Sequence, residues 1–456
     1  MSQDSYRPSF NLSRVDASVA QPVRLFFASA FLWLILASIL SVITAIQLKD
    51  VSFLGGCSLT TYGRLKALEG NLFAYGWVTN ALFGLNLWLM SSLTRFEFKN
   101  AWLANVGGVV WNLTLTYGAI QIILGNMNGL SLLEMPKEVA VASFVGFLLA
   151  ALWPAVAFSR RPTGHVYVSQ WYILGSTFVF PIIFALTQLL VLWCPAQGVL
   201  QALVHSWFHQ NFYLLWFASS AIAAVYYFIP KESGRTVSAY YLSTVGFWTF
   251  FLVASWTSPA TLLGSPLPLW VQSTGVVAAI LMLIPLVILA INFLGTLSWN
   301  RGISQSWNNT TLRFVLVAIF ALILWGALFA TFSTRGLNAV IRFTSFNTGL
   351  EHLLTYSFVS FVIFGAAYFI LPKVTGTSWL SSKLVHLHFW SCAIGTVSLL
   401  IITLLGGWQQ GSGLRADWPS VIFPSVLLLI GHIAFGINAF GMLTAKLSSG
   451  HESTHA

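Results

Sequence analysis

The chain has 456 residues, of which 57% are hydrophobic and only 7% are charged. Soluble domains carry about 25% charged residues, so this composition excludes an ordinary soluble enzyme or binding module. The net charge is +10, but the basic residues are scattered over short loops between apolar segments. We therefore expect contact with membrane lipid and no nucleic-acid binding. The composition predicts an all-α integral membrane protein.

Apolar stretches long enough to cross about 30 Å of hydrocarbon recur along the whole chain. Breaker clusters separate them, as in "IPKESGRT" at 229–236. We expect twelve membrane-spanning helices, at residues 24–47, 71–94, 101–125, 138–159, 170–193, 211–229, 240–257, 267–296, 312–333, 349–371, 384–406 and 420–444. This division leaves tails at 1–23 and 446–456 around a membrane domain over 24–445.

The distribution of basic residues predicts the orientation. If the helices alternate in direction, the side that holds both tails carries roughly twice as many Lys and Arg residues as the other. The positive-inside rule then places both termini in the cytoplasm. We expect a multi-pass protein of the bacterial cytoplasmic (inner) membrane.

Six stretches together resemble a known family. They are "TTYGRLKALEGNLFAYGW" (60–77), "LGNMNGLSLLEMPKEVAVA" (124–142), "GHVYVSQWY" (164–172), "YYFIPKESGRTVSAYYLSTVGFW" (226–248), "RGLNAVIRFTSFNTG" (335–349) and "KLVHLHFWSCAIGTV" (383–397). Their order and spacing resemble the twelve-helix catalytic subunit I of the cbb-type cytochrome c oxidases, in the haem–copper oxidase superfamily. The resemblance covers about residue 25 to 445 and implies the same twelve-helix bundle.

The resemblance also implies which positions would hold cofactors. Members of the family bind a low-spin haem, a high-spin haem and a copper ion through six histidines. His352 matches one low-spin haem ligand, while Glu69 stands at the position of the other. Leu350 stands at the position of the high-spin haem ligand, two residues before His352 on the same expected helix.

The positions that match the copper ligands are Gln210, Ala260 and Thr261, and the redox-active tyrosine position is Ala254. His209 lies one step from Gln210, and a local helix bulge would bring it into place. No histidine lies between His209 and His352, so a three-histidine copper site cannot be built there. We expect no catalytic residue, no copper and no other metal site.

Two interpretations of His352 stay open. One is that His352 alone holds a haem b. The other, which we favour, is that no haem is bound and that a direct Glu69–His352 hydrogen bond replaces it. A carboxylate bonded to an imidazole would satisfy both groups in a low dielectric and would join the second expected helix to the tenth.

Further polar residues match family positions near the outer membrane face, where haem propionates and a cation lie. They are Arg64, Glu134, Arg335, Asn338 and Arg342. Glu351 departs from the family pattern, and we favour a role as partner of Arg335 or Arg342 over a role in proton relay.

The expected function is therefore that of an oxidase subunit I homologue without its oxygen-reducing site. We expect a structural member of a respiratory hetero-oligomer that docks membrane-anchored cytochrome c or other subunits. Two alternatives stay open. The first is an active terminal oxidase or nitric oxide reductase with haem. The second is a proton or small-solute pathway that uses Glu69, Glu351 and Gln210.

Overall fold

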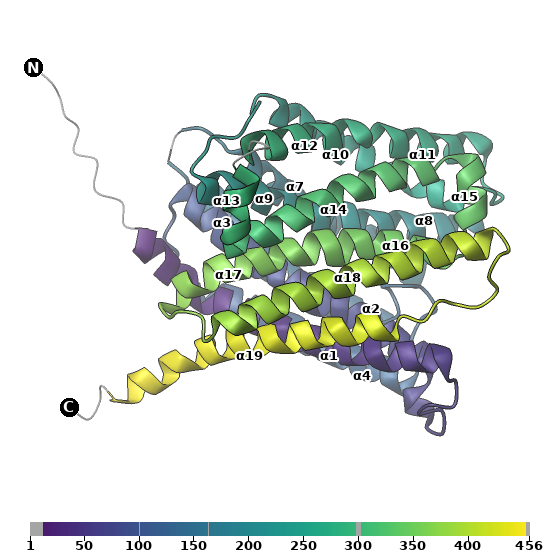
Figure 1. The fold of residues 1–456 in the computed structure, drawn as a ribbon, viewed down its shortest axis with the longest axis horizontal. Helices are drawn as coiled ribbons and strands as arrows, with labels where there is room; N and C mark the ends of the chain where they lie inside the picture. Colours follow the sequence, from purple (N-terminus) through teal and green to yellow (C-terminus); the bar gives the residue numbers. More distant parts are fainter. Residues whose placement is uncertain (1–11, 100, 163, 298–301, 453–456) are drawn as a thin grey trace, which may run out of the picture.

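The computed structural model describes residues 12–99, 101–162, 164–297 and 302–452, and every regular element in these ranges is helical. The long helices lie side by side as one elongated bundle (Figure 1). Helix α1 begins, and helix α19 ends, at the same end of the bundle, which we call the terminus side. The other end, to the right in Figure 1, is the opposite side.

The first half of the chain forms α1 (Leu12–Lys49), η1 (Ser58–Thr60), α2 (Tyr62–Asn71), η2 (Leu72–Thr79), α3 (Asn80–Thr94), α4 (Trp102–Leu124), α5 (Lys137–Ala151), α6 (Trp153–Ser159), α7 (Val168–Gln188), η3 (Leu189–Trp193), α8 (Val199–Asn211), η4 (Phe212–Ala218) and α9 (Ser219–Ser233). The second half forms α10 (Leu242–Ala254), η5 (Ser258–Leu262), α11 (Leu269–Leu281), α12 (Leu283–Leu297), α13 (Gly302–Asn308), α14 (Thr310–Phe332), α15 (Arg335–Ile341), α16 (Ser345–His352), η6 (Leu353–Ser360), α17 (Phe361–Thr375), α18 (Ser382–Gly411) and α19 (Ile422–Glu452).

Ten helical stretches among the described residues are long and apolar enough to cross a membrane. The expected segments 71–94 and 240–257 are also largely helical but do not belong to these ten. Buried asparagines lower the apolarity of the first, and α10 has only 13 residues, or about 20 Å, in the second. A multi-pass membrane protein is therefore confirmed, whereas the count of twelve spans and the cytoplasmic termini stay predictions.

Helix α1 begins earlier than the expected boundary at residue 24. Its first turns are held by packing, because Val15, Val19 and Val23 are fully buried. The indole nitrogen of Trp88 on α3 donates a hydrogen bond of 2.9 Å to Asp16. These tertiary contacts extend the helix over residues that the apolar pattern alone had left in a tail. At the other end of the chain, α19 continues past residue 445.

Two helical stretches form the centre of the bundle. In Val199–Ser233 and Ser345–Thr375 the most apolar window is 89% buried, against 39–61% in the other eight spans. Each changes from α-helical to π-helical geometry within its length, at η4 and η6, and the second expected span does the same at η2. A π-helical turn holds more residues than an α-helical turn, so it rotates the side chains that follow, and such turns are frequent at functional sites.

Large aromatic side chains fill the middle of the bundle. Phe180 stacks on Phe212 with ring centroids 5.0 Å apart and on Trp216 at 5.5 Å. Trp77 stacks on Phe364 at 5.0 Å and donates a hydrogen bond of 3.0 Å to Ser360. Because these rings are buried, the middle of the bundle is a close-packed aromatic layer.

Candidate functional site

Three of the cavities on the opposite side of this aromatic layer are lined by residues that the sequence analysis singles out. The Arg342 cavity, of about 370 Å³, lies among α8, η5, α14, α15 and α16. The Glu134 cavity, of about 470 Å³, lies among α2, the loop between α4 and α5, α16 and η6. The Ser425 cavity, of about 370 Å³, lies among α1, α2, α16, α18 and α19. Glu351 lines the first two cavities, and Glu69 and His352 line the last two.

The Arg342 cavity collects four of the positions that the family resemblance singles out. Gln210 on α8, Ala260 and Thr261 on η5, and Leu350 on α16 all line it. Ala254 at the end of α10 does not line it and is fully buried. Residues from three distant parts of the sequence therefore meet around one space.

His209 lines the same cavity as Gln210. Its Nε2 atom lies 3.9 Å from Oε1 of Glu351, and its ring lies one helical turn from that of His205, with centroids 6.2 Å apart. The Nε2 atom of His205 is 2.9 Å from the carbonyl oxygen of Ser131. The π-helical segment η4 begins directly after this region, at Phe212.

The expected pairing of Glu351 with an arginine is not what the structure shows. The nearest ionisable partner of Glu351 is His209. Arg335 is exposed and donates a hydrogen bond of 2.6 Å to the hydroxyl of Ser273.

Arg342 stacks its guanidinium on the Phe343 ring at 4.8 Å, and its Nε atom is buried with no hydrogen-bond partner. Both arginines lie on or directly after the short helix α15, before α16 begins, whereas Glu351 lies near the far end of α16.

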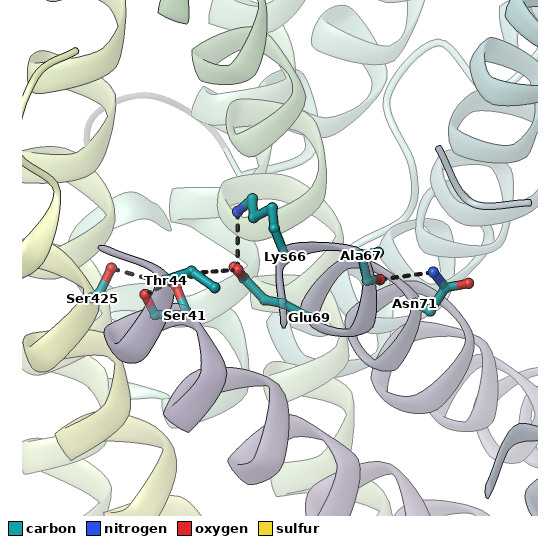
Figure 2. Close-up of polar contacts among 7 residues, drawn as sticks. All are labelled: Ser41, Thr44, Lys66, Ala67, Glu69, Asn71 and Ser425. Carbon is teal, nitrogen blue, oxygen red and sulfur yellow. Dashed lines mark hydrogen bonds and ion pairs between the residues drawn. The ribbon is translucent and has the colours of Figure 1, made fainter. Parts of the chain in front are cut away.

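Glu69 has different partners from the one that the sequence suggested. Its Oε2 atom accepts hydrogen bonds from Lys66 at 3.0 Å and from Thr44 of α1 at 2.8 Å (Figure 2). His352 instead packs edge-on against Tyr356, with ring centroids 5.2 Å apart. A lysine ammonium one turn away on the same helix competes well for a carboxylate, because the hydrogen bond is charge-assisted. Glu69 thus joins α2 to α1 and shares two cavities with His352.

The polar cluster expected near the outer face is divided between two places. Arg64 donates to the carbonyl of Ile123 at 2.9 Å and lies against Gly125, where a Cβ atom would come within 2.5 Å of the guanidinium. Glu134 accepts a hydrogen bond of 2.7 Å from Asn71. Burial raises the pKa of Glu134 to about 7, an effect that the Asn71 hydrogen bond partly opposes. Asn338 lies elsewhere, lining the Arg342 cavity.

Sequence reasoning missed three residues of this site. Lys66 precedes Glu69 by three residues, and this spacing on a helix is typical of an ion pair. His205 precedes His209 by four residues, a spacing that also places two side chains on one helix face. Thr44 carried no signal, because only the packing of α1 against α2 brings it to Glu69.

The fold and the arrangement of these positions define a class: a multi-pass membrane protein built like subunit I of the haem–copper oxidases. A solved haem–copper terminal oxidase dimer has the same fold, with a TM-score of 0.71, 13% identity, and coverage of 94% of this chain and 84% of that one. The model of the family described as "Cytochrome C and Quinol oxidase polypeptide I" matches residues 21–434, and the chain belongs to this family.

Curated relatives agree with the resemblance found in the sequence. The chain is 27% identical over 416 residues to "Cbb3-type cytochrome c oxidase subunit CcoN1" of Stutzerimonas stutzeri, covering 86% of this chain and 84% of that protein. It is 24% identical over 436 residues to "Cytochrome c oxidase subunit 1 homolog" of Azorhizobium caulinodans, covering 90% and 74%. The predicted membership of the haem–copper oxidase superfamily is confirmed.

At the positions that match the family's copper ligands, the donor atoms do not fit a copper ion, although the imidazoles of His205 and His209 also line the Arg342 cavity. Copper in this superfamily takes imidazole nitrogens, whereas the matching positions offer an amide, a methyl group and a hydroxyl. In the part of the chain that the structure describes, no three side chains of His, Cys, Asp or Glu lie within reach of one metal ion. At the low-spin haem position, His352 offers an imidazole, while Glu69 is held by Lys66 and Thr44.

Proposed function

We propose that this protein is a subunit I homologue that has lost the oxygen-reducing haem–copper site and acts as a structural subunit of a respiratory membrane complex. One observation carries the proposal: Gln210, Ala260, Thr261 and Leu350 surround one cavity, at positions where an active enzyme needs histidines. The amide, methyl, hydroxyl and isobutyl groups of these residues do not replace three copper ligands and a haem ligand.

The proposed structural role rests on the helix surfaces that a subunit without cofactors would still present. A bundle of this size in the inner membrane presents long apolar helices to lipid and to other membrane-spanning subunits. We propose partners of the kind found with active relatives, namely membrane-anchored cytochrome c subunits or an authentic oxidase subunit, in a hetero-oligomer. Affinity purification from native membranes, followed by haem staining of the co-purified chains, tests this part. Recovery of the chain by itself, after mild solubilisation that keeps an authentic oxidase intact, would contradict it.

The cofactor content is tested by a reduced-minus-oxidised optical spectrum of the purified protein, with haem and copper measured per chain. We expect neither cofactor. A stoichiometric haem that disappears in His352→Ala would make His352 a haem ligand and the protein an electron carrier. Two haems and one copper would overturn the proposal and support an active oxidase or nitric oxide reductase.

A second candidate is a proton or small-solute pathway, because Glu69, Glu351 and Gln210 all line cavities that share wall residues. The aromatic layer counts against a pathway through the whole membrane, since stacked rings such as Phe180 and Trp216 separate the cavities from the terminus side. Proteoliposomes with an interior pH dye test this candidate. Proton leak that exceeds that of empty vesicles and falls in Glu351→Gln would favour it over the structural role.

A further inference from the structure

The Arg342 cavity carries opposite charges at its two ends. Arg342 lies just before α16, and Glu351 lies near the other end of that helix. The rise of an α-helix places Ser345 and Glu351 about 9 Å apart along the axis. Both charged side chains line the same space of about 370 Å³.

The positive end lacks an internal anion. Among the described residues, the acids that form ion pairs are Glu69, Glu351 and Asp417, and none of them pairs with Arg342. The Nε atom of Arg342 is buried without a hydrogen-bond partner, and the guanidinium rests on an aromatic ring. A guanidinium without an ion-pair partner favours a carboxylate, which it can bind with two parallel hydrogen bonds.

The negative end is also incompletely satisfied. The distance of 3.9 Å between His209 and Glu351 is too long for a hydrogen bond. Lys66 lies on the wall of the neighbouring Glu134 cavity and is already bonded to Glu69. The carboxylate of Glu351 is therefore able to receive hydrogen bonds from a ligand in the Arg342 cavity.

The wall between the two charges suits a short flexible ligand. The lining includes polar groups of Gln210, Thr261 and Asn347 and apolar side chains such as Phe329 and Leu350. A hydrocarbon segment would contact the apolar side chains, and charged ends would reach past them. The lining thus fits an amphoteric molecule better than a purely apolar one.

We propose that the Arg342 cavity binds a small ω-amino acid, with the ligand's carboxylate at Arg342 and its ammonium group at Glu351. This inference rests on the proposed function, because the cavity must be free of haem. The paired charges give selectivity: a dicarboxylate would meet Glu351 with a like charge, and a diamine would meet Arg342 with a like charge. Like-charge contacts of this kind are costly in a desolvated site.

The test compares three ligands of equal length by isothermal titration calorimetry on the purified, detergent-solubilised chain. The ligands are 5-aminovalerate, glutarate and cadaverine, which differ only in their end groups. We expect 5-aminovalerate to bind at least about tenfold more tightly than either of the others. Equal affinities for all three, or no measurable binding of 5-aminovalerate at millimolar concentration, would overturn the proposal.

Single variants assign the two ends. Arg342→Gln should weaken 5-aminovalerate binding and shift the preference toward cadaverine, whereas Glu351→Gln should weaken it and shift the preference toward glutarate. Arg335→Gln is the matched control, because Arg335 lies on α15 but its side chain bonds Ser273 outside the cavity. Parallel weakening of all three ligands in both variants would contradict the assignment, and thermal melts without ligand identify a variant that has unfolded.

Haem is measured in the same sample, so the two proposals fail separately. Stoichiometric haem would contradict the proposed function. A haem-free chain that binds the three ligands alike would contradict this inference and leave the structural role intact.

Discussion

The two halves of this bundle differ in what fills the space between the helices. Toward the middle and the terminus side, rings interlock, as where Trp88 meets Phe369 edge-on at 5.7 Å and Phe228 meets Phe369 at 5.2 Å. On the opposite side, three cavities are lined by polar groups and by several of the positions that the family resemblance predicts as cofactor-ligand positions. Aromatic side chains therefore fill one part of the bundle and leave open space in the other, although the whole sequence is rich in aromatic residues.

The largest expected effect comes from opening the aromatic layer. Trp216→Ala should lower stability by about 3–5 kcal/mol, because it removes a buried ring that packs on Phe83, Phe147 and Phe180. Leu350→Ala at the edge of the Arg342 cavity should cost clearly less, since the space beside it is already open. Thermal unfolding in detergent measures both. A smaller loss for Trp216→Ala than for Leu350→Ala would mean that the aromatic layer is not the stable half.

The hydrogen bonds of Glu69 should give the next largest effect. Glu69→Gln should cost about 1–3 kcal/mol, because the Lys66 ammonium and the Thr44 hydroxyl lose a charged acceptor. Double-mutant cycles separate the partners: coupling of Glu69→Gln with Lys66→Gln should exceed its coupling with His352→Ala. The reverse order would support the direct Glu69–His352 pair that the sequence suggested.

Added volume should be tolerated in one half and not in the other. Ala218→Leu in η4 should cost about 1–3 kcal/mol, because this fully buried residue has close-packed neighbours. Asn347→Phe should change stability by less than about 0.5 kcal/mol, since its side chain borders the Arg342 cavity. Equal losses in the two variants, from melts under one set of conditions, would show that the cavity does not exist in solution.

The last expected effect is a pH dependence from Glu134, which is spread over more than two pH units and is therefore small within any one unit. Its pKa is raised from 4.5 to about 7 in the folded protein, so between these pH values the folded chain holds a proton that the unfolded chain releases. Stability should therefore fall as the pH rises through this window, by at most about 1.4 kcal/mol per pH unit. Glu134→Gln should remove this slope, which melting temperatures between pH 4.5 and 8 would reveal. An unchanged slope in the variant would assign the titration to another group.

Much of the fold was predictable from the sequence because the bilayer imposes a simple requirement. A chain that crosses hydrocarbon must satisfy its backbone internally, so long apolar runs become helices and their positions follow from composition. The start of α1 was misplaced because contacts such as Trp88–Asp16 extend that helix beyond its apolar run. The expected segments 71–94 and 240–257 are not among the ten long apolar helices. The first contains buried asparagines and the second contains the short helix α10, and only tertiary packing explains both features.

The candidate site, like the fold, was predictable from the sequence only in part. The sequence by itself, through the family resemblance, predicted which residues stand at the family's ligand positions, namely Gln210, Ala260, Thr261, Leu350 and His352. Only the tertiary structure decided which groups meet. Thr44 reaches Glu69 because α1 packs on α2, and His209 lies beside Glu351 because α8 and α16 border the same cavity, and neither approach is encoded in a local pattern.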